Sequence, residues 1–364
     1  MGKYFRIKVG LSMAQVFCWL ATVTALLILP STIELPELSA TIWLLMFLGW
    51  SLLISVPADI IAGKMLPERQ GMYSMIFDGW WKKWLRAIIV QTVFFLLMGG
   101  WLLFMGSKFG RMGTIGGFSL MMLLTGGLQI WLARATVRWE SFFDNHKGKL
   151  VVYLDNEDPA FTGGISGIPG MEIFVIPNSW RKEMDARMLG VIKGRRHGAI
   201  QTLGHAKGFL AAFLLNLLAF TAAILLIEDG TSTGLGLVQT VSLFGLFQVA
   251  GTALILTPLS RKAVWEVDRW VFYRGGDADS LRASFHKIAV NEELAEFGTL
   301  SSVLQPMPSP SSRSQHIASQ QESRGAWNAA RLSIFLSWAA LNPLARSLPI
   351  MLGRPERWVF LPSD

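Results

Sequence analysis

The stretch of residues 176–268 decides how this 364-residue chain folds. A segment with apolar residues at helical spacing ends in Arg195-Arg196-His197-Gly198-Ala199. Two long apolar runs follow, and the stretch closes with Ser260-Arg-Lys-Ala-Val-Trp-Glu-Val-Asp268. The sequence therefore predicts two polar helices that lie on the same side of a membrane, joined by a hydrophobic hairpin that crosses it twice.

The composition of the whole chain agrees with a membrane location. Hydrophobic residues make up 52%, charged residues only 16%, and the mean hydropathy is +0.41. Six segments approach the ~20 apolar residues that cross a bilayer: 11–29, 40–62, 87–105, 112–133, 208–227 and 235–256. The sequence predicts a polytopic α-helical membrane protein with about six transmembrane helices and a small cytoplasmic α+β domain.

Lysine and arginine gather in the flanks that share one side of this topology. The N-terminal flank, the loop between spans two and three, and the segment after span four are basic, whereas 31–39 and 228–234 contain neither residue type. Lys108 and Arg111, between spans three and four, are the exceptions to this distribution. The positive-inside bias predicts cytoplasmic termini in a bacterial inner membrane. The net charge of +8 is then a topology and lipid signal, so we expect membrane lipids and no nucleic acid as partners.

The order of these elements resembles the HtpX-like and CAAX-prenyl-protease class of integral-membrane zinc metallopeptidases. That class carries H-E-x-x-H on one helix, two membrane spans, and S-R-x-x-E-x-E-x-D on another helix. In the corresponding positions this chain has Arg195 and Ala199 for the two histidine ligands, Arg196 for the catalytic glutamate and Val264 for the third ligand, while Asp268 matches the aspartate. The resemblance implies a metallopeptidase-like domain without catalytic residues, metal or cofactor.

Elementary coordination chemistry supports the same expectation. Guanidinium is always protonated and does not coordinate a cation. His197 and His205 are eight residues apart, about 12 Å along a helix, and cannot share one ion. We expect Arg195 or Arg196 to pair with Asp268 and to replace the cross-link that zinc makes in the family; the alternative is two solvated arginines.

The polar segment 134–207 contains strand-like runs at 150–154 and 172–177, separated by a Gly- and Pro-rich stretch. Its glycines lack the Lys-Ser/Thr of a phosphate loop. They resemble the family's N-A-F-x-x-G turn, which leads into a strand that holds extended peptide by main-chain hydrogen bonds. The possible peptide-holding rim comprises Phe161, Gly163, Gly164, Ile173, Phe174 and Val175.

These patterns divide the chain into six parts. Residues 1–133 form four spans with an interfacial aromatic and basic segment near 72–86, 134–207 and 259–300 form the peptidase-like domain, and 208–258 form the hairpin. The Pro-, Ser- and Gln-rich part, 301–325, is predicted to be a disordered linker. Residues 326–364 are predicted to be an interfacial or docking segment whose removal leaves the membrane domain folded. Its possible partner-docking residues are Trp327, Trp338, Trp358 and Phe360.

The sequence favours a catalytically inactive membrane protein that serves as a scaffold, adaptor or accessory subunit of a membrane-protein complex. One alternative is an active membrane metallopeptidase with a non-standard site. Another is a transporter or lipid-handling protein, which predicts ionisable residues within the spans. We expect the span interiors to contain only neutral polar residues, namely Gln91, Gln129, Asn216, Gln239 and Gln248.

Overall fold

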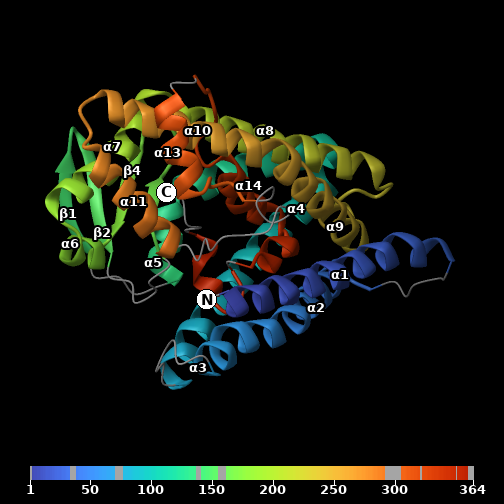
Figure 1. Cartoon of the computed structure of the whole chain (residues 1–364). Coiled ribbons are helices and arrows are strands. Elements are labelled where there is room, and N and C mark those ends of the chain that lie inside the picture. The colour runs from blue at the N-terminus through green and yellow to red at the C-terminus, as the bar shows by residue number, and fades with distance from the viewer. Residues whose placement is uncertain are drawn as a thin grey trace.

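The computed structural model describes residues 2–32, 38–69, 77–136, 141–154, 161–291, 305–319, 322–349 and 351–359. The described part is mostly helical, with 78% of its residues in helices, several of them long and apolar, and one small sheet (Figure 1). The elements before the sheet are α1 (Gly2–Thr32), α2 (Ala40–Ile60), the π-helical turn η1 (Ile61–Met65), α3 (Leu66–Arg69), α4 (Phe77–Gly127) and α5 (Gln129–Thr136).

The sheet and the elements after it complete the fold. The strands are β1 (Ser141–His146), β2 (Lys149–Leu154), β3 (Gly164–Ser166) and β4 (Ile173–Pro177). The helices that follow are α6 (Asn178–Glu183), α7 (Ala186–Gln201), α8 (Gly204–Leu226), α9 (Gly234–Gly251), η2 (Thr252–Leu256), α10 (Thr257–Tyr273), α11 (Ala278–Asn291), α13 (Pro310–Ser319), α14 (Ala329–Ser337), η3 (Trp338–Ala340), η4 (Pro343–Ser347) and η5 (Pro355–Trp358).

Five helical stretches of the described residues are long and apolar enough to cross a membrane: 6–28, 40–69, 79–127, 204–226 and 234–273. The third contains two of the predicted spans, because α4 reverses direction at Gly110 (φ 62°, ψ −162°). The indole Nε1 of Trp101 donates to the carbonyl of Gly117 at 3.2 Å, whereas residues 16 apart in a straight helix lie about 24 Å apart. The predicted spans 87–105 and 112–133 are therefore neighbouring arms of a hairpin.

The sheet lies at one end of the molecule beside α6, α7 and α11 (Figure 1). Its strand order is β1-β2-β4-β3, with β2 and β4 parallel and the other two pairs antiparallel. The residues of β2 and β4 alternate between two buried clusters, one shared with the apolar helices and one shared with α7 and α10. The sheet thus connects the long helices to the polar helices that carry the candidate site.

We call the described residues between 326 and 359 the C-terminal strap. They form short helices between α1, α4, α8 and α9, in the middle of the helical assembly (Figure 1). Trp327, Trp338 and Trp358 are each 0% exposed, and the ring of Trp338 stacks on that of Phe95 at 5.0 Å. The prediction that these three tryptophans dock a partner is wrong, because this chain's own helices bury them. Phe360 lies outside the described residues.

The irregular backbone of the strap is hydrogen-bonded by side chains of the long helices. Gln91 Nε2 donates to Pro355 O at 2.7 Å, Gln129 Nε2 to Val359 O at 2.7 Å, and Asn216 Nδ2 to Ser333 O at 3.0 Å. Non-helical backbone at membrane depth requires such partners, since no water is there to provide them. Three of the neutral polar residues of the predicted spans therefore hold the strap.

The segment predicted to lie at the membrane interface also contacts the strap. Trp80 and Trp84 are each 5% exposed, and the Nε1 of Trp80 donates to Gly353 O at 3.0 Å. Trp84 Nε1 donates to the carboxylate of Asp59 at 3.1 Å. The interfacial prediction is therefore wrong for these two indoles, which face the interior, while Lys82 and Lys83 are exposed.

Candidate functional site

Two helices of the site are positioned by local features of the sequence. Asp185 caps α7 by accepting the backbone N–H of Met188 at 2.7 Å. Beyond the cap, α7 packs against α10, and Ala199 and Val264 join one buried apolar cluster between the two helices. The residues in the ligand positions of the peptidase family thus meet across this interface, as the resemblance implies, but Ala199 and Val264 contribute only apolar surface.

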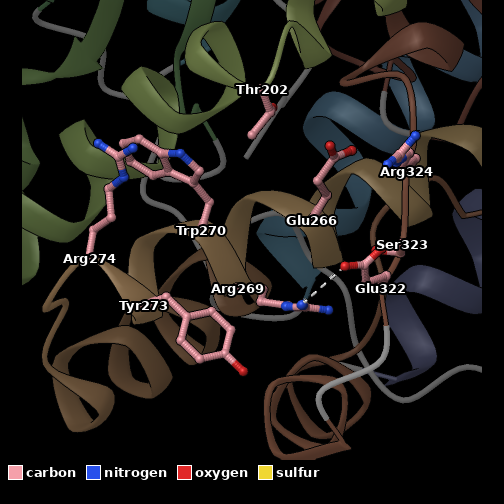
Figure 2. A pocket seen from close by; sticks show the side chains of 9 residues that line it. All are labelled: Thr202, Glu266, Arg269, Trp270, Tyr273, Arg274, Glu322, Ser323 and Arg324. Carbon is pink, nitrogen blue, oxygen red and sulfur yellow. Dashed lines mark ion pairs between the residues drawn. The ribbon is translucent and has the colours of Figure 1, made fainter.

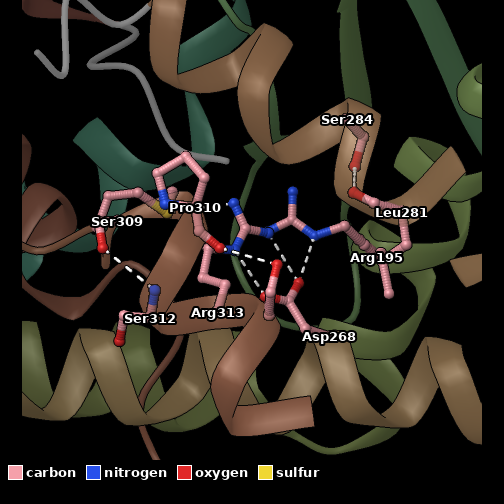
Figure 3. A network of polar contacts seen from close by, with 10 residues as sticks. Arg195, Asp268, Leu281, Ser284, Ser309, Pro310, Ser312 and Arg313 are labelled. Carbon is pink, nitrogen blue, oxygen red and sulfur yellow. Dashed lines mark hydrogen bonds and ion pairs between the residues drawn. The ribbon is translucent and has the colours of Figure 1, made fainter. Parts of the chain in front are cut away.

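The centre of the site is the carboxylate of Asp268 on α10. Arg195 on α7 donates Nε–H to its Oδ1 at 2.8 Å, while Arg313 on α13 donates Nε–H to Oδ2 at 2.7 Å and Nη2–H to Oδ1 at 2.8 Å. Figure 3 shows both guanidinium groups directed at this carboxylate. All three side chains are at most 1% exposed. The predicted pairing of an α7 arginine with Asp268 is confirmed, with Arg195 as the partner.

The second arginine of this cluster comes from a segment predicted to be disordered. Arg313 lies on α13, and its guanidinium carbon lies 3.6 Å from the centre of the Phe285 ring. The disordered-linker prediction is wrong for residues 305–319, because a buried ion pair and ring stacking offset the cost of ordering them. Ser309 followed by Pro310 is a helix-start signal that predicts α13, and Ser309 Oγ does accept the Ser312 N–H.

Arg196, in the position of the catalytic glutamate, turns toward the sheet. It donates to Val175 O at 2.5 Å and to Thr162 O at 2.9 Å, and it is 0% exposed. Of the expected peptide-holding rim, β4 is an inner strand of the sheet, whereas β3 is an edge strand. Both sides of β4 pair with neighbouring strands, β2 and β3, and Arg196 covers part of the adjoining backbone. The rim residues are buried apart from the partly exposed Ile173; they are Phe161, Gly163, Gly164, Phe174 and Val175.

Trp327 of the strap also covers this site. The guanidinium carbon of Arg195 lies 5.5 Å from the centre of the Trp327 ring. Trp327 belongs to the buried cluster that contains Ala199 and Val264. Among the described residues, no group of three or more His, Cys, Asp or Glu side chains is arranged to hold a metal ion. Apolar and cationic groups thus surround the one central carboxylate.

The two histidines at and just after the end of α7, His197 and His205, lie apart and have different environments. His205 is 1% exposed, and its Nε2 lies 3.1 Å from Gly167 O, so it is an interior residue. His197 is half-buried beside His146 and Trp270, with ring centroids 6.3 Å and 6.0 Å away. Burial, and then nearby cations such as Lys147, lower the pKa of His197 below its usual range.

A second buried carboxylate lies away from this site, in a span that was expected to contain no ionisable residue. Asp59 falls within the second predicted span and is 2% exposed. It accepts hydrogen bonds from Arg346 at 2.5 Å, Trp84 at 3.1 Å and the N–H of Gly353 at 2.9 Å. The spans therefore do contain an ionisable residue. Its fixed contacts with the strap indicate a structural role rather than a transport path.

Comparison with solved structures identifies a protein with a similar fold. The crystal structure of S. mikatae Ste24p matches this chain with a TM-score of 0.63 and 13% sequence identity, over 82% of this chain and 79% of that chain. Ste24p is a CAAX prenyl protease, an integral-membrane zinc metallopeptidase. Neither the protein-family models nor the curated proteins give a match. The chain is a multi-pass membrane protein with a Ste24p-like, metallopeptidase-type fold.

Proposed function

We propose that this chain is a non-catalytic membrane protein with a metallopeptidase fold, acting as a scaffold, adaptor or accessory subunit of a membrane-protein complex. The observation that carries the proposal is the buried cluster of Asp268 with Arg195 and Arg313. Arginine binds carboxylate through a charged hydrogen-bonded fork, and it repels rather than coordinates a metal cation. The cluster therefore supplies a link between α7 and α10 that needs no ion.

Two further features support a structural rather than a catalytic role. Catalytic zinc requires about three protein donors and an open position for water or substrate. The ligand positions offer Arg195, Ala199 and Val264, and the space around them contains the buried ring of Trp327.

The distribution of lysine and arginine supports cytoplasmic termini and a bacterial inner membrane.

The test combines metal analysis with a peptidase assay on the full chain purified in detergent. We expect much less than one zinc per chain, and no cleavage of a quenched fluorescent peptide, with or without added zinc. A matched variant carries Arg195→His and Arg196→Glu; it should remain inactive, because Ala199 and Val264 still provide no ligand. About one zinc per chain, lost on substitution of residues 195–199 or 264–268, would contradict the proposal.

The scaffold role is tested separately by affinity purification from native membranes. We expect a membrane protein to co-purify at a reproducible stoichiometry. Because Trp327, Trp338 and Trp358 are buried, that partner is expected to contact surfaces other than these side chains. A protein that purifies alone and degrades unfolded membrane proteins would be a peptidase instead.

A further inference from the structure

Two groups of basic side chains outside the Asp268 cluster differ in how they are arranged. One group lines a cavity of about 340 Å³ beside α10, where Arg274 and Arg324 lie at opposite ends with the Trp270 ring and the Glu266 carboxylate between them (Figure 2). These arginines do not converge on one ligand. The other group lies at the start of α4 and the end of α5, where two neighbouring helices bring their cations to one place.

The two arms of the α4 hairpin run side by side as far as α5. That helix continues the second arm, because Leu128 N donates to Leu124 O at 2.8 Å. Arg86, on the first arm, donates Nε–H to Ala135 O at 2.9 Å and Nη2–H to Arg134 O at 3.4 Å. Arg86 and Arg134 therefore lie at the same height along the hairpin.

This height coincides with a predicted membrane boundary. Arg86 immediately precedes the third predicted span, and Arg134 immediately follows the fourth. Lys82 is four residues before Arg86, so it lies on the same face of α4, about 6 Å further along the axis. Lys82 and Arg134 are exposed. Because neither 81–86 nor 129–136 contains an acidic residue, both stretches carry only positive charge.

An exposed indole accompanies these cations. Trp131 is 65% exposed, and the guanidinium carbon of Arg134 lies 5.5 Å from the centre of its ring. Stacking of this kind orients a guanidinium and leaves its N–H edge available for hydrogen bonds, and an indole is typical of the headgroup level of a bilayer. We call Lys82, Arg86, Trp131 and Arg134 the boundary patch.

Exposed apolar side chains lead from the boundary patch along both arms of the hairpin. Those at helical spacing are 44–65% exposed and comprise Ile89, Val93 and Leu97 on the first arm, and Leu120, Leu124 and Trp131 on the second. In a hairpin that crosses a bilayer, such uncovered rows contact lipid tails. A molecule at this place therefore meets cations at one end and apolar rows beside the rest of its length.

We propose that the boundary patch binds an anionic phospholipid, with its phosphate between α4 and α5 and its acyl chains along the apolar rows. Lysine and arginine next to a span attract anionic headgroups, and a guanidinium forms strong charged hydrogen bonds with phosphoryl oxygens. The site uses none of the residues of the Asp268 cluster. It therefore goes beyond the proposed scaffold function and can be tested independently of it.

The experiment titrates the full chain in detergent with dioleoyl-phosphatidylglycerol and counts bound lipid by native mass spectrometry. Dioleoyl-phosphatidylcholine, which has the same chains and no net charge, is the reference lipid. We expect a saturable site for phosphatidylglycerol and at least about tenfold weaker binding of phosphatidylcholine. The Lys82→Gln/Arg134→Gln variant removes one exposed cation from each arm and should bind phosphatidylglycerol at least about tenfold more weakly than the unmodified chain.

The matched control is Lys207→Gln/Lys262→Gln, which removes two exposed lysines from the first turns of α8 and α10. It should bind phosphatidylglycerol as the unmodified chain does. Equal affinity for the two lipids, an affinity that Lys82→Gln/Arg134→Gln leaves unchanged, or an equal loss in both double variants overturns the proposal.

A deacylated headgroup separates a lipid from a soluble anion. Glycerophosphoglycerol lacks the acyl chains that the apolar rows accommodate, so it should bind at least about tenfold more weakly than dioleoyl-phosphatidylglycerol. Equal binding of the two would assign the boundary patch to a soluble phosphate ester and overturn the lipid assignment.

A second measurement needs no variant. Phosphatidylglycerol should slow the acylation of Lys82 by a lysine-selective reagent, compared with the same detergent containing phosphatidylcholine, as read by peptide mass spectrometry of the unmodified chain. Lys207 and Lys262 are the internal references and should react equally with either lipid. An unchanged rate at Lys82, or an equal decrease at all three lysines, also overturns the proposal.

Discussion

Two buried aspartates, Asp268 on α10 and Asp59 on α2, are each held by an arginine from beyond residue 304. Asp268 receives hydrogen bonds from Arg195 and Arg313, and all of these donors are charged. Asp59 receives one charged donor, Arg346, together with a neutral indole N–H and a backbone N–H. The C-terminal part of the chain thus forms a buried ion pair with each aspartate, through Arg313 at Asp268 and through Arg346 at Asp59.

The difference between the two clusters lies in what happens if the negative charge is lost. At Asp268 an uncharged replacement leaves two buried guanidinium groups facing each other. At Asp59 an amide still offers an oxygen to the N–H of Gly353 or to Trp84, and one guanidinium loses its partner. The first cluster therefore depends on charge, and the second depends in part on an acceptor oxygen.

The largest effect is expected from removing the strap, which supplies an arginine or a covering ring to both clusters. Deletion of residues 326–364 exposes apolar surface of α4, α8 and α9 and leaves Gln91, Gln129 and Asn216 without their strap acceptors. We expect aggregation or loss of the monodisperse peak in size-exclusion chromatography. This reverses the prediction from sequence that such a truncation leaves a folded membrane protein.

A matched deletion of residues 360–364 keeps every described contact of the strap and is the control. It should purify as the full chain does. Comparable melting temperatures for the long and the short deletion would contradict a strap that holds the helices together.

The next largest effect is expected at the charged cluster. Asp268→Ala removes the partner of both Arg195 and Arg313 and should lower the free energy of unfolding by about 3–5 kcal/mol, the cost of leaving a buried charge unpaired. The variant should be absent from the membrane fraction, or, if it accumulates there, the detergent-solubilised protein should melt at a lower temperature than the unmodified chain. Asp279→Ala is the control, because this carboxylate is exposed and, among the described residues, forms an ion pair only with the exposed Arg282.

A triple variant sharpens the interpretation of this cluster. Replacing Arg195 and Arg313 with Met together with Asp268→Ala removes all three charges and should recover part of the lost stability. If Asp268→Ala melts at the same temperature as the unmodified chain, the cluster does not tie α7, α10 and α13 together.

A smaller effect is expected at the mixed cluster. Asp59→Asn keeps an acceptor oxygen but weakens the bond from Arg346, so the expected loss is about 1–3 kcal/mol of unfolding free energy. Thermal melts of Asp59→Asn and Asp268→Asn in the same detergent measure the comparison directly. Asp268→Asn should be the more destabilised of the two, and the reverse order would remove the distinction drawn between the clusters.

The membrane class could be predicted from local composition, because apolar runs of suitable length predict the helices. The meeting of Arg195, Ala199, Val264 and Asp268 across α7 and α10 was implied by the resemblance of these positions to the metallopeptidase family, and the opposite charges of arginine and aspartate predicted the pairing. The Ste24p-like match supports the same fold. The predicted contact between Arg195 and Asp268 is confirmed, whereas the absence of catalysis remains a prediction.

The C-terminal contacts could not be predicted in the same way, because they join residues far apart in the chain. Arg346 pairs with a residue 287 positions earlier, and neither partner has a local signature of that contact. The density of tryptophan in the strap fits an external docking surface and a buried core equally well. At Gly208 the structure gives a physical reason for burial: a Cβ there would lie 1.9 Å from the carbonyl oxygen of Trp327, so only glycine permits this close crossing.

The smallest expected effect is a pH dependence that comes from the sheet end of the molecule. Burial, and then nearby cations, lower the pKa values of both His146 and His197. The unfolded chain, with a histidine pKa of about 6.5, therefore binds more protons than the folded chain below that pH, and stability falls as the pH drops through this range. Melting temperatures should decrease from pH 7.5 to 5.5, and the decrease should be smaller in His197→Gln. His286→Gln, at an exposed position on α11, should keep the full decrease, and equal slopes in all three proteins would rule out His197 as a source of the pH dependence.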